Sequence, residues 1–266
     1  MSQPATIFNK YEKVKHLIRP LAKVAVAYSG GVDSSLLLYA SIEALGYSNV
    51  VAIHGRSCLN ISEEGVDEIH QRNFIQHKKL VIIDLKPLGW PDFIENDKKR
   101  CYYCKKKTYQ SFRDYLAEQG DIILLDGTNT DDLLEERAGL VVLKEMKVRT
   151  PLADAGLNKK DVRFLARKFN LSNYNSPSNS CLATRLSFLS TIDSNKLKIV
   201  ERIEDQLKKM GFFGCRVKPY QDMIIIEVRQ QDYVKISQRH NRIAIIGVCN
   251  TLGFNRVLLD LKGRHQ

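Results

Sequence analysis

One short segment of the sequence has residue types and spacing that suit the binding of an anion. The segment Ser29–Ser35 reads SGGVDSS, and it follows the apolar run Val24–Ala27 and precedes a leucine-rich helical pattern. Glycines let a backbone approach a ligand closely, and the N–H groups at the start of a helix attract negative charge. The pattern is neither GxxxxGK[ST] nor GxGxxG. It predicts an anion site of another class at this strand-to-helix turn.

The cysteine pair Cys101 and Cys104 is the second candidate for chemistry, and it lies in the basic, aromatic run 98–107. Three interpretations of this CxxC stay open. It is half of a zinc site, although the sequence has no second CxxC; it is a redox dithiol; or it supplies two ligands of an iron–sulfur cluster, with a third cysteine elsewhere. The cations of the run would attract an anionic substrate, or they simply form the solvated end of a helix.

A third candidate lies in the irregular stretch 148–186, whose last part is rich in Ser and Asn. Such a stretch is either a linker or a functional loop, and the presence of Cys181 and Arg185 favours function. The other three cysteines match no ligand spacing, so we interpret them as small core or surface residues. They are Cys58, Cys215 and Cys249.

The elements that must position these residues follow an alternating pattern in the first half of the chain. Short apolar runs predict strands, and helical patterns separate them, with Ser62 as a candidate helix cap. This alternation predicts an α/β fold, a parallel sheet with helices on both faces. The strands are expected at 23–29, 49–55, 78–85 and 121–127, and the helices at 34–45, 62–76 and 106–120.

The last part of the chain predicts a small α+β domain. It contains an amphipathic helical pattern that stops at Gly211, a hairpin formed by 215–221 and 223–229, a helical pattern over 231–252 and a final strand at 256–261. We therefore expect two domains, residues 1–186 and residues 187–266.

Several segments, taken together, resemble one known family over nearly the whole chain. In order they are SGGVDSS, RCYYCK, DGTNTDD, VRTPLADAGLNKKDVRFLARKFNL and SPSNSCLATR. They are similar to the LarE family of ATP-dependent sulfur transferases, within the PP-loop (ATP pyrophosphatase) superfamily. The resemblance implies an enzyme that adenylates a carboxylate of a pyridinium dicarboxylate mononucleotide, releases AMP and pyrophosphate, and forms a thiocarboxylate in nickel-pincer nucleotide cofactor biosynthesis.

The resemblance also implies where ATP and Mg²⁺ bind. Asp33 would act through Mg²⁺, because a carboxylate beside phosphates otherwise repels them. His54 ends the second strand and would either line the nucleotide site or be an ordinary loop residue, and Gly127 ends a later strand and would point toward the same crevice. Asp131 and Asp132 either support Mg²⁺ or cap the next helix. The residues expected to hold the leaving pyrophosphate are Ser29, Gly30, Gly31, Asp33, Ser34 and Ser35.

For the sulfur chemistry, the resemblance implies the three-cysteine version of the family. In that version Cys101, Cys104 and Cys181 ligate a [4Fe–4S] cluster that carries sulfur from sulfide or another donor. In the alternative version the cysteine at the position of Cys181 gives up its own sulfur. The phosphate of the pyridinium substrate would be bound by Arg216, Lys218 and Arg185. Lys218 replaces an arginine of the family strand and loses bidentate geometry, and Arg185 could instead pair with a loop acid.

Composition leaves rival functions open. The net charge of +11 suits a polyanion such as tRNA, and tRNA thiolases share the PP-loop and the three-cysteine cluster. Against tRNA, the sequence has no recognisable tRNA-binding module. A nucleotide sensor or an amide-forming ligase would not need the cysteines.

The chain has neither a membrane-spanning run nor a signal-peptide pattern, so we expect a cytoplasmic protein. The tendency of the family implies a homo-oligomer, in particular a hexamer.

Overall fold

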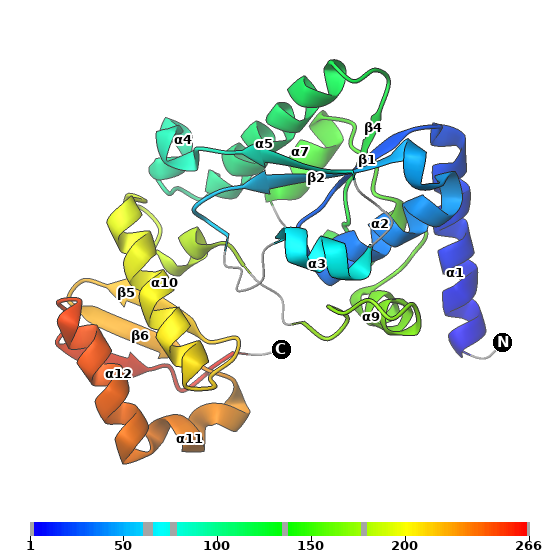
Figure 1. Cartoon of the computed structure of the whole chain (residues 1–266). Helices are drawn as coiled ribbons and strands as arrows, with labels where there is room; N and C mark the ends of the chain where they lie inside the picture. The colour runs from blue at the N-terminus through cyan, green and yellow to red at the C-terminus, as the bar shows by residue number, and fades with distance from the viewer. Residues whose placement is uncertain (1–2, 61–65, 75–78, 135–137, 177–179, 265–266) are drawn as a thin grey trace. The chain divides into compact units, whose positions relative to one another are not determined.

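The computed structural model describes residues 3–60, 66–74, 79–134, 138–176 and 180–264 (Figure 1). The chain forms two compact units, each assembled from several segments. The first comprises Met1–Arg56, Ser62–Leu85 and Cys101–Ser176, and the second comprises Ser57–Ile61, Lys86–Arg100 and Pro177–Gln266. The division into domains at residues 1–186 and 187–266 stays a prediction.

The first unit is built on a four-stranded sheet in which all neighbouring strands are parallel. The strand order is β3-β2-β1-β4. The bounds are Val24–Ala27 for β1, Val50–Arg56 for β2, Leu80–Asp84 for β3 and Ile123–Leu125 for β4. The predicted parallel α/β sheet is confirmed, and β1 is one of its two central strands.

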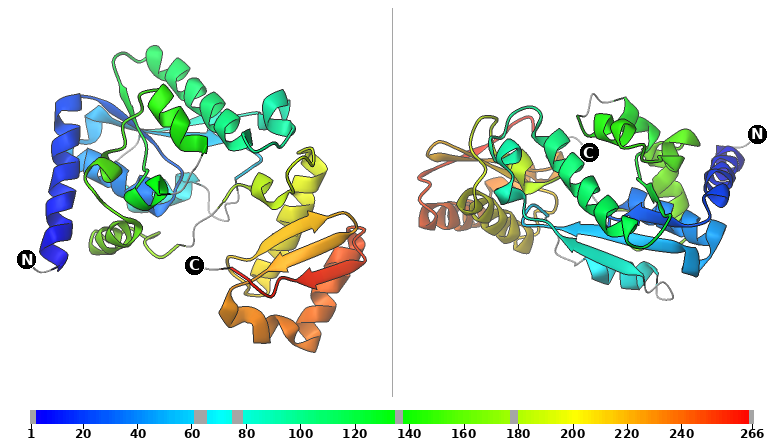
Figure 2. Two further views of the ribbon diagram at one scale, coloured as in Figure 1. Left: turned by 180° about the vertical axis from the view of Figure 1, so that it is seen from behind. Right: turned by 90° about the horizontal axis from the view of Figure 1, so that it is seen from above.

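Helices cover both faces of this sheet, as Figure 2 shows from two sides. Successive side chains of a strand point to opposite faces. Val24 and Val26 therefore pack into one apolar core with α1 (Gln3–Ile18), α2 (Val32–Leu45) and α9 (Lys159–Lys168). On the opposite face, Ala25 packs into a second core with α5 (Arg100–Ala117) and α7 (Ala138–Glu145). The remaining helices of the unit are α3 (Val66–Asn73), α6 (Thr130–Leu133) and α8 (Pro151–Asp154).

Helix α5 begins earlier than the expected residue 106, so that prediction was wrong at its N-terminal end. The helix starts at Arg100 because Asp97 satisfies the first N–H groups: its carboxylate accepts from Lys99 (2.7 Å) and its carbonyl from Arg100 (3.2 Å). The CxxC therefore lies in the first turns of a helix and not ahead of it. The predicted cap Ser62 lies outside the described residues.

The second unit contains a three-stranded sheet of order β5-β6-β7. Strands β5 (Arg216–Tyr220) and β6 (Met223–Glu227) form the predicted antiparallel hairpin, and β7 (Arg256–Leu259) adds parallel to β6. The helices of the unit are α4 (Pro91–Ile94), α10 (Ser194–Lys209), α11 (Tyr233–Ser237) and α12 (Arg239–Thr251). The expected continuous helix over 231–252 is two helices, because the backbone of Gln238 is extended (ψ 141°).

Across the residues that the structure places, no helix is both long and apolar enough to cross a membrane.

Candidate functional site

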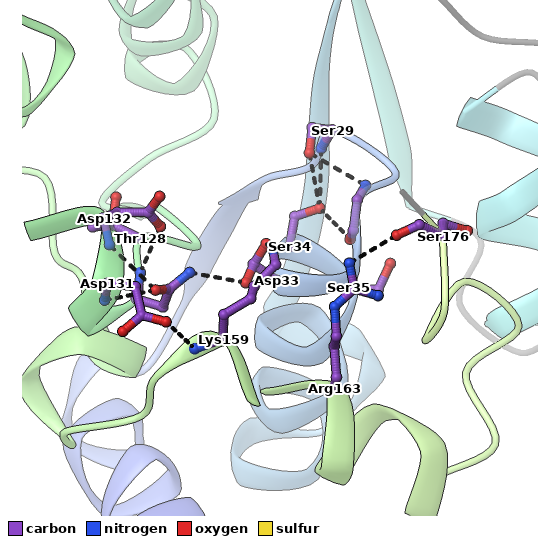
Figure 3. A network of polar contacts seen from close by, with 12 residues as sticks. Ser29, Asp33, Ser34, Ser35, Thr128, Asp131, Asp132, Lys159, Arg163 and Ser176 are labelled. Atoms are coloured by element: carbon purple, nitrogen blue, oxygen red, sulfur yellow. Dashed lines mark hydrogen bonds and ion pairs between the residues drawn. The ribbon is translucent and has the colours of Figure 1, made fainter. Parts of the chain in front are cut away.

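The loop between β1 and α2 is shaped by two glycines and closed by one serine. Gly30 has a φ of +74°, a conformation that side-chain-bearing residues rarely adopt, and Gly31 is the N-cap of α2. The Ser34 hydroxyl accepts from the Ser29 N–H (3.2 Å) and donates to the Gly31 carbonyl (3.0 Å), as Figure 3 shows. The loop is thus held in one conformation at the N-terminus of α2, where a helix attracts anions.

The segment after β4 passes directly beside the start of α2. A Cβ atom on Gly127 would lie 3.0 Å from the Ser34 nitrogen and 3.2 Å from the Asp33 carbonyl carbon. A side chain at this position would push the two backbones apart by a few tenths of an ångström. Gly127, which the sequence analysis expected at the nucleotide site, therefore lies against the start of α2.

Asp33 is held by a lysine that the sequence analysis did not single out. The Lys159 ammonium pairs with one oxygen of the Asp33 carboxylate, and the Asn129 side-chain amide donates to the other (3.1 Å) (Figure 3). Lys159 is the first residue of α9, which Asn158 caps, and its own N–H donates to Asp131 (3.0 Å). The signal available in the sequence was the helix start LNKKD. A cation therefore already lies against Asp33.

The two acids that follow Asn129 have different roles. Asn129 is the N-cap of α6, and its N–H donates to the Asp132 carboxylate (3.1 Å), which completes a capping box. The helix-cap interpretation is therefore what the structure shows for Asp132. Asp131 instead accepts the N–H of Lys159.

Ser35 lies behind the loop, where its side chain is buried. The Asn173 side-chain amide donates both to the Ser35 hydroxyl (2.9 Å) and to the Gly30 carbonyl (2.7 Å). Nearby, the Arg163 guanidinium donates to the Ser176 carbonyl (2.9 Å), as Figure 3 shows, and also to the Tyr174 carbonyl (2.8 Å). Ser35 therefore supports the conformation of the loop from inside, and Asn173 is a supporting residue that the sequence did not reveal.

His54, on β2, is buried beside β1. Its Nδ1 lies 2.9 Å from the Tyr28 carbonyl, and because a carbonyl only accepts, Nδ1 carries the proton. Burial lowers the pKa of His54, and the neighbouring Arg56 lowers it further, against the opposing effects of the Tyr28 hydrogen bond and Asp67. The side chain is therefore a neutral imidazole at physiological pH.

The two cysteines of the CxxC lie one helical turn apart in α5, so they face the same side of the helix. Cys101 is exposed and Cys104 is half-buried. The next residue, Lys105, pairs with Asp126 at the end of β4 (3.2 Å), and the Tyr109 hydroxyl donates to the same carboxylate. Burial alone would raise the pKa of Asp126, but Lys105 and hydrogen bonds including those of Tyr109 lower it. The CxxC helix is thus anchored beside Gly127.

Cys181 lies in the second unit, immediately before the short 3-10 helix Leu182–Arg185. Arg185 is 4% exposed, and its guanidinium makes a bidentate pair with Glu204 of α10 (2.8 and 3.3 Å). It also donates to the Ser180 carbonyl (3.1 Å). Of the two interpretations of Arg185, the ion pair is the one that the structure shows, with an acid on a helix and not in a loop.

The two basic residues of β5 differ in their surroundings. Lys218 pairs with Glu227 of the adjacent strand. The Nε of Arg216 is buried and has no hydrogen-bond partner among the described residues. Burial lowers the pKa of Arg216, and the nearby Arg264 and Arg185 lower it further, against the opposing effects of Glu227 and Glu204. An unsatisfied donor in a cationic environment is suited to accept an anion.

The donor set for a metal cluster is split between the two units. Cys101 and Cys104 belong to the first and Cys181 to the second, and all six cysteines of the chain are thiols. In the described ranges, no group of three or more His, Cys, Asp or Glu side chains is gathered so that it could hold a metal ion.

The fold and this site define an α/β protein with a glycine-containing loop between the first strand of a parallel sheet and the helix that follows it. The chain is 30% identical over 262 residues to the pyridinium-3,5-bisthiocarboxylic acid mononucleotide synthase of Lactiplantibacillus plantarum, which covers 97% of this chain and 93% of that protein. The chain therefore belongs to the LarE family, the family of that synthase.

Two uncharacterized proteins are similar over most of their length. The relative from Synechocystis sp. is 30% identical over 257 residues, with 96% of this chain and 94% of that protein covered. The relative from Methanocaldococcus jannaschii is 31% identical over 243 residues, with 90% of each covered. The chain matches no protein-family model.

Proposed function

We propose that this protein is an ATP-dependent sulfur transferase of nickel-pincer nucleotide cofactor biosynthesis. It adenylates a carboxylate of a pyridinium dicarboxylate mononucleotide, releases AMP and pyrophosphate, and exchanges the adenylate for sulfur. The observation that carries the proposal is the Gly30–Ser34 loop at the start of α2, with Lys159 paired to Asp33, in a chain related over its length to a bisthiocarboxylate mononucleotide synthase.

In this proposal the loop binds the phosphates that leave. Charge develops on pyrophosphate as its bond to the α-phosphorus breaks, so fixed N–H donors at the N-terminus of α2 stabilise that step more than they stabilise bound ATP. The donors are ready before ATP arrives, because Ser34 and Asn173 already hold the loop. Lys159 adds a positive charge beside them.

Asp33 is a fitting ligand for the Mg²⁺ that accompanies ATP. Its carboxylate is partly exposed and already attracts the Lys159 ammonium, and Mg²⁺ prefers carboxylate oxygens together with phosphate oxygens. In the proposal, Mg²⁺ at Asp33 releases Lys159 toward the phosphates.

The sulfur chemistry is assigned to Cys101, Cys104 and Cys181, whose thiols would hold a [4Fe–4S] cluster. The donor chemistry fits, because thiolates are the usual ligands of such clusters and the start of a helix favours the thiolates of the CxxC. When bound, the cluster would supply a place for sulfide, so that no protein cysteine is consumed. The Cys181 carbonyl accepts from the Thr184 hydroxyl (2.7 Å), which orders the backbone that presents this thiol.

Arg216 is assigned to the phosphate of the mononucleotide. A phosphate there would satisfy its buried Nε and offset the repulsion among the neighbouring arginines. Lys218 and Arg185 would contribute positive charge from the positions that they already occupy. Lys218 pairs there with Glu227, and Arg185 pairs with Glu204.

Anaerobic purification followed by iron and sulfide analysis, with mass spectrometry of the protein after turnover, tests the sulfur route. The proposal expects iron and sulfide in the protein and an unchanged polypeptide mass. Dehydroalanine at residue 181, in protein that carried its iron, would contradict it and favour donation by Cys181 itself.

A tRNA thiolase is the second candidate, favoured by the net charge of +11. It requires tight tRNA binding that survives physiological salt, together with no activity on the mononucleotide.

A further inference from the structure

The segment that follows β7 brings a second arginine, Arg264, to the start of β5, where Arg216 lies. The Arg264 N–H donates to the Val228 carbonyl (3.0 Å), one residue after the end of β6. Its guanidinium extends toward β5 and donates to the Gly214 carbonyl, two residues before Arg216. All of these residues belong to the second unit.

The backbone just before Arg264 is held by close contacts. Gly263 has a φ of +61°, and a Cβ atom there would lie 2.9 Å from the Val228 carbonyl oxygen. The Asp260 N–H donates to the Ile226 carbonyl (2.9 Å), and the Asp260 carbonyl accepts the Gly263 N–H (3.2 Å). These contacts attach the segment to β6 and fix the point from which the Arg264 side chain extends.

The two acids nearest these arginines each pair with another cation. Glu204 accepts two hydrogen bonds from the Arg185 guanidinium (2.8 and 3.3 Å). Glu227, opposite Arg216 in the hairpin, pairs with Lys218. Two of the four cations in this part of the unit are thus balanced by close carboxylates.

Arg216 and Arg264 are the two cations that remain. In the part of the chain that the structure describes, no carboxylate forms an ion pair with either guanidinium. Burial and then the charge of Arg264 lower the pKa of Arg216, so the two groups lie close enough to repel each other. Burial likewise lowers the pKa of Arg264, and Arg185 lowers it further. Opposing effects on Arg264 come from three nearby groups, Glu227, Cys215 and Glu204.

A terminal phosphate matches two such cations in charge and in geometry. A phosphate monoester carries close to two negative charges at neutral pH, because its second pKa is about 6, whereas each phosphodiester of a nucleic acid carries one. Guanidinium groups bind phosphate oxygens through parallel N–H donors. Arg216 offers its buried Nε, which has no partner among the described residues. Arg264 has further N–H groups besides the one that donates to Gly214.

We propose that Arg264 is a second phosphate-binding residue that, together with Arg216, selects a terminal phosphate dianion over a phosphodiester. This inference deepens the proposed function and rests on it, because the phosphate is that of the mononucleotide assigned to Arg216. The same selectivity disfavours the phosphodiester backbone of tRNA at this site.

Calorimetric titration of the full chain with methyl phosphate and with dimethyl phosphate tests the proposal at neutral pH. The parent protein should bind methyl phosphate at least about tenfold more tightly than dimethyl phosphate, the effect of one further hydrogen bond from a charged donor. In Arg264→Met the affinity for methyl phosphate should fall by about tenfold, and the preference should largely disappear. Arg256→Met, which removes an exposed arginine of β7, is the matched control and should bind both compounds as the parent does.

The pH dependence gives a readout that a merely structural role of Arg264 would not change. As the pH falls below about 6, methyl phosphate takes up a proton and keeps one negative charge. The parent protein should therefore lose its preference for methyl phosphate over this range. In Arg264→Met the affinity for methyl phosphate should change less with pH.

Two further variants make the outcome decisive. Arg264→Lys decides if Arg264→Met does not fold: it keeps the charge but lacks the planar set of donors, so its affinity for methyl phosphate should still fall several-fold. Unchanged affinity in the folded Arg264 variants, or a preference for methyl phosphate as strong in Arg264→Met as in the parent, would overturn the proposal. Loss of binding in Arg216→Met alone would leave the phosphate site of the proposed function in place and remove Arg264 from it, whereas a parent protein that binds neither compound would remove both.

Discussion

The Lys159 ammonium lies against the Asp33 carboxylate and joins two segments that are 126 positions apart. Asp33 is in the first turn of α2 and Lys159 in the first turn of α9, so a positive charge and a negative charge meet where two helix N-termini converge. In the proposed function, this pair balances the charge of Asp33 within a loop that binds phosphates, until Mg²⁺ and ATP arrive.

Lys159→Met should lower kcat/KM for ATP by roughly 10²–10³-fold, the usual loss when one fixed donor to a developing charge is removed. Steady-state release of pyrophosphate measures this effect. The matched control is Lys160→Met, which removes the adjacent, exposed lysine and should leave the rate within a factor of a few. Equal rates in the two variants would show that Lys159 has no part in the adenylation step.

Gly30→Ala should lower the free energy of unfolding by about 1–2 kcal/mol, because Gly30 has a φ of +74° and a Cβ disfavours that conformation. ATP affinity should fall as well, since the loop can no longer hold its N–H groups in place. Urea unfolding and calorimetric titration measure the two effects. Gly31→Ala is the control, because the φ of Gly31 is −73° and its added Cβ would meet only the end of the Ser29 side chain (3.2 Å). A larger cost at Gly31 than at Gly30 would contradict this view of the loop.

Arg216→Met should weaken binding of the pyridinium mononucleotide by at least about tenfold, with little change in ATP binding. Stability should not fall, because the substitution removes a buried Nε that has no partner among the described residues and relieves repulsion by Arg264 and Arg185. Thermal unfolding with and without inorganic phosphate gives the readout, and phosphate should stabilise the parent protein more than the variant. Identical stabilisation of both by phosphate would remove Arg216 from the anion site.

His54 should make the protein less stable as the pH falls. Burial lowers the pKa of His54 in the folded state, so the unfolded chain takes up the proton first, at its ordinary pKa of about 6.5. The free energy of unfolding should therefore decline as the pH is lowered through that value. In His54→Asn, which keeps a donor toward the Tyr28 carbonyl, the decline should be smaller. An identical pH profile for His54→Asn and the parent would refute the assignment.

The features that the sequence predicts well are local ones. The glycine loop and the end of α2 at Gly46, directly after the expected helix 34–45, depend on residues that are neighbours in the chain. The hairpin of β5 and β6 is equally local, and apolar alternation is enough to place the sheet. Whether Asp132 supports Mg²⁺ or caps a helix is also decided by a local contact, because its carboxylate accepts the N–H of Asn129, three residues earlier.

The features that the sequence could not predict depend on contacts between distant segments. The pairing of Lys159 with Asp33, the support of Gly30 by Asn173 across 143 positions and the contact of Arg264 with Gly214 have no periodic signature. Gly127 was predicted from its place after a strand, but the reason for a glycine there, the backbone of Ser34 at 3.0 Å, is visible only in the fold.

The most direct test of the proposed activity follows both products of one reaction. Anaerobically prepared protein is incubated with ATP, Mg²⁺, sulfide and the pyridinium-3,5-dicarboxylate mononucleotide, and chromatography with mass spectrometry identifies the nucleotide and pyridinium products. The account predicts AMP and pyrophosphate together with a mononucleotide in which sulfur replaces a carboxylate oxygen, over more turnovers than there are polypeptides. ADP as the nucleotide product, or consumption of ATP with the mononucleotide unchanged, would contradict it.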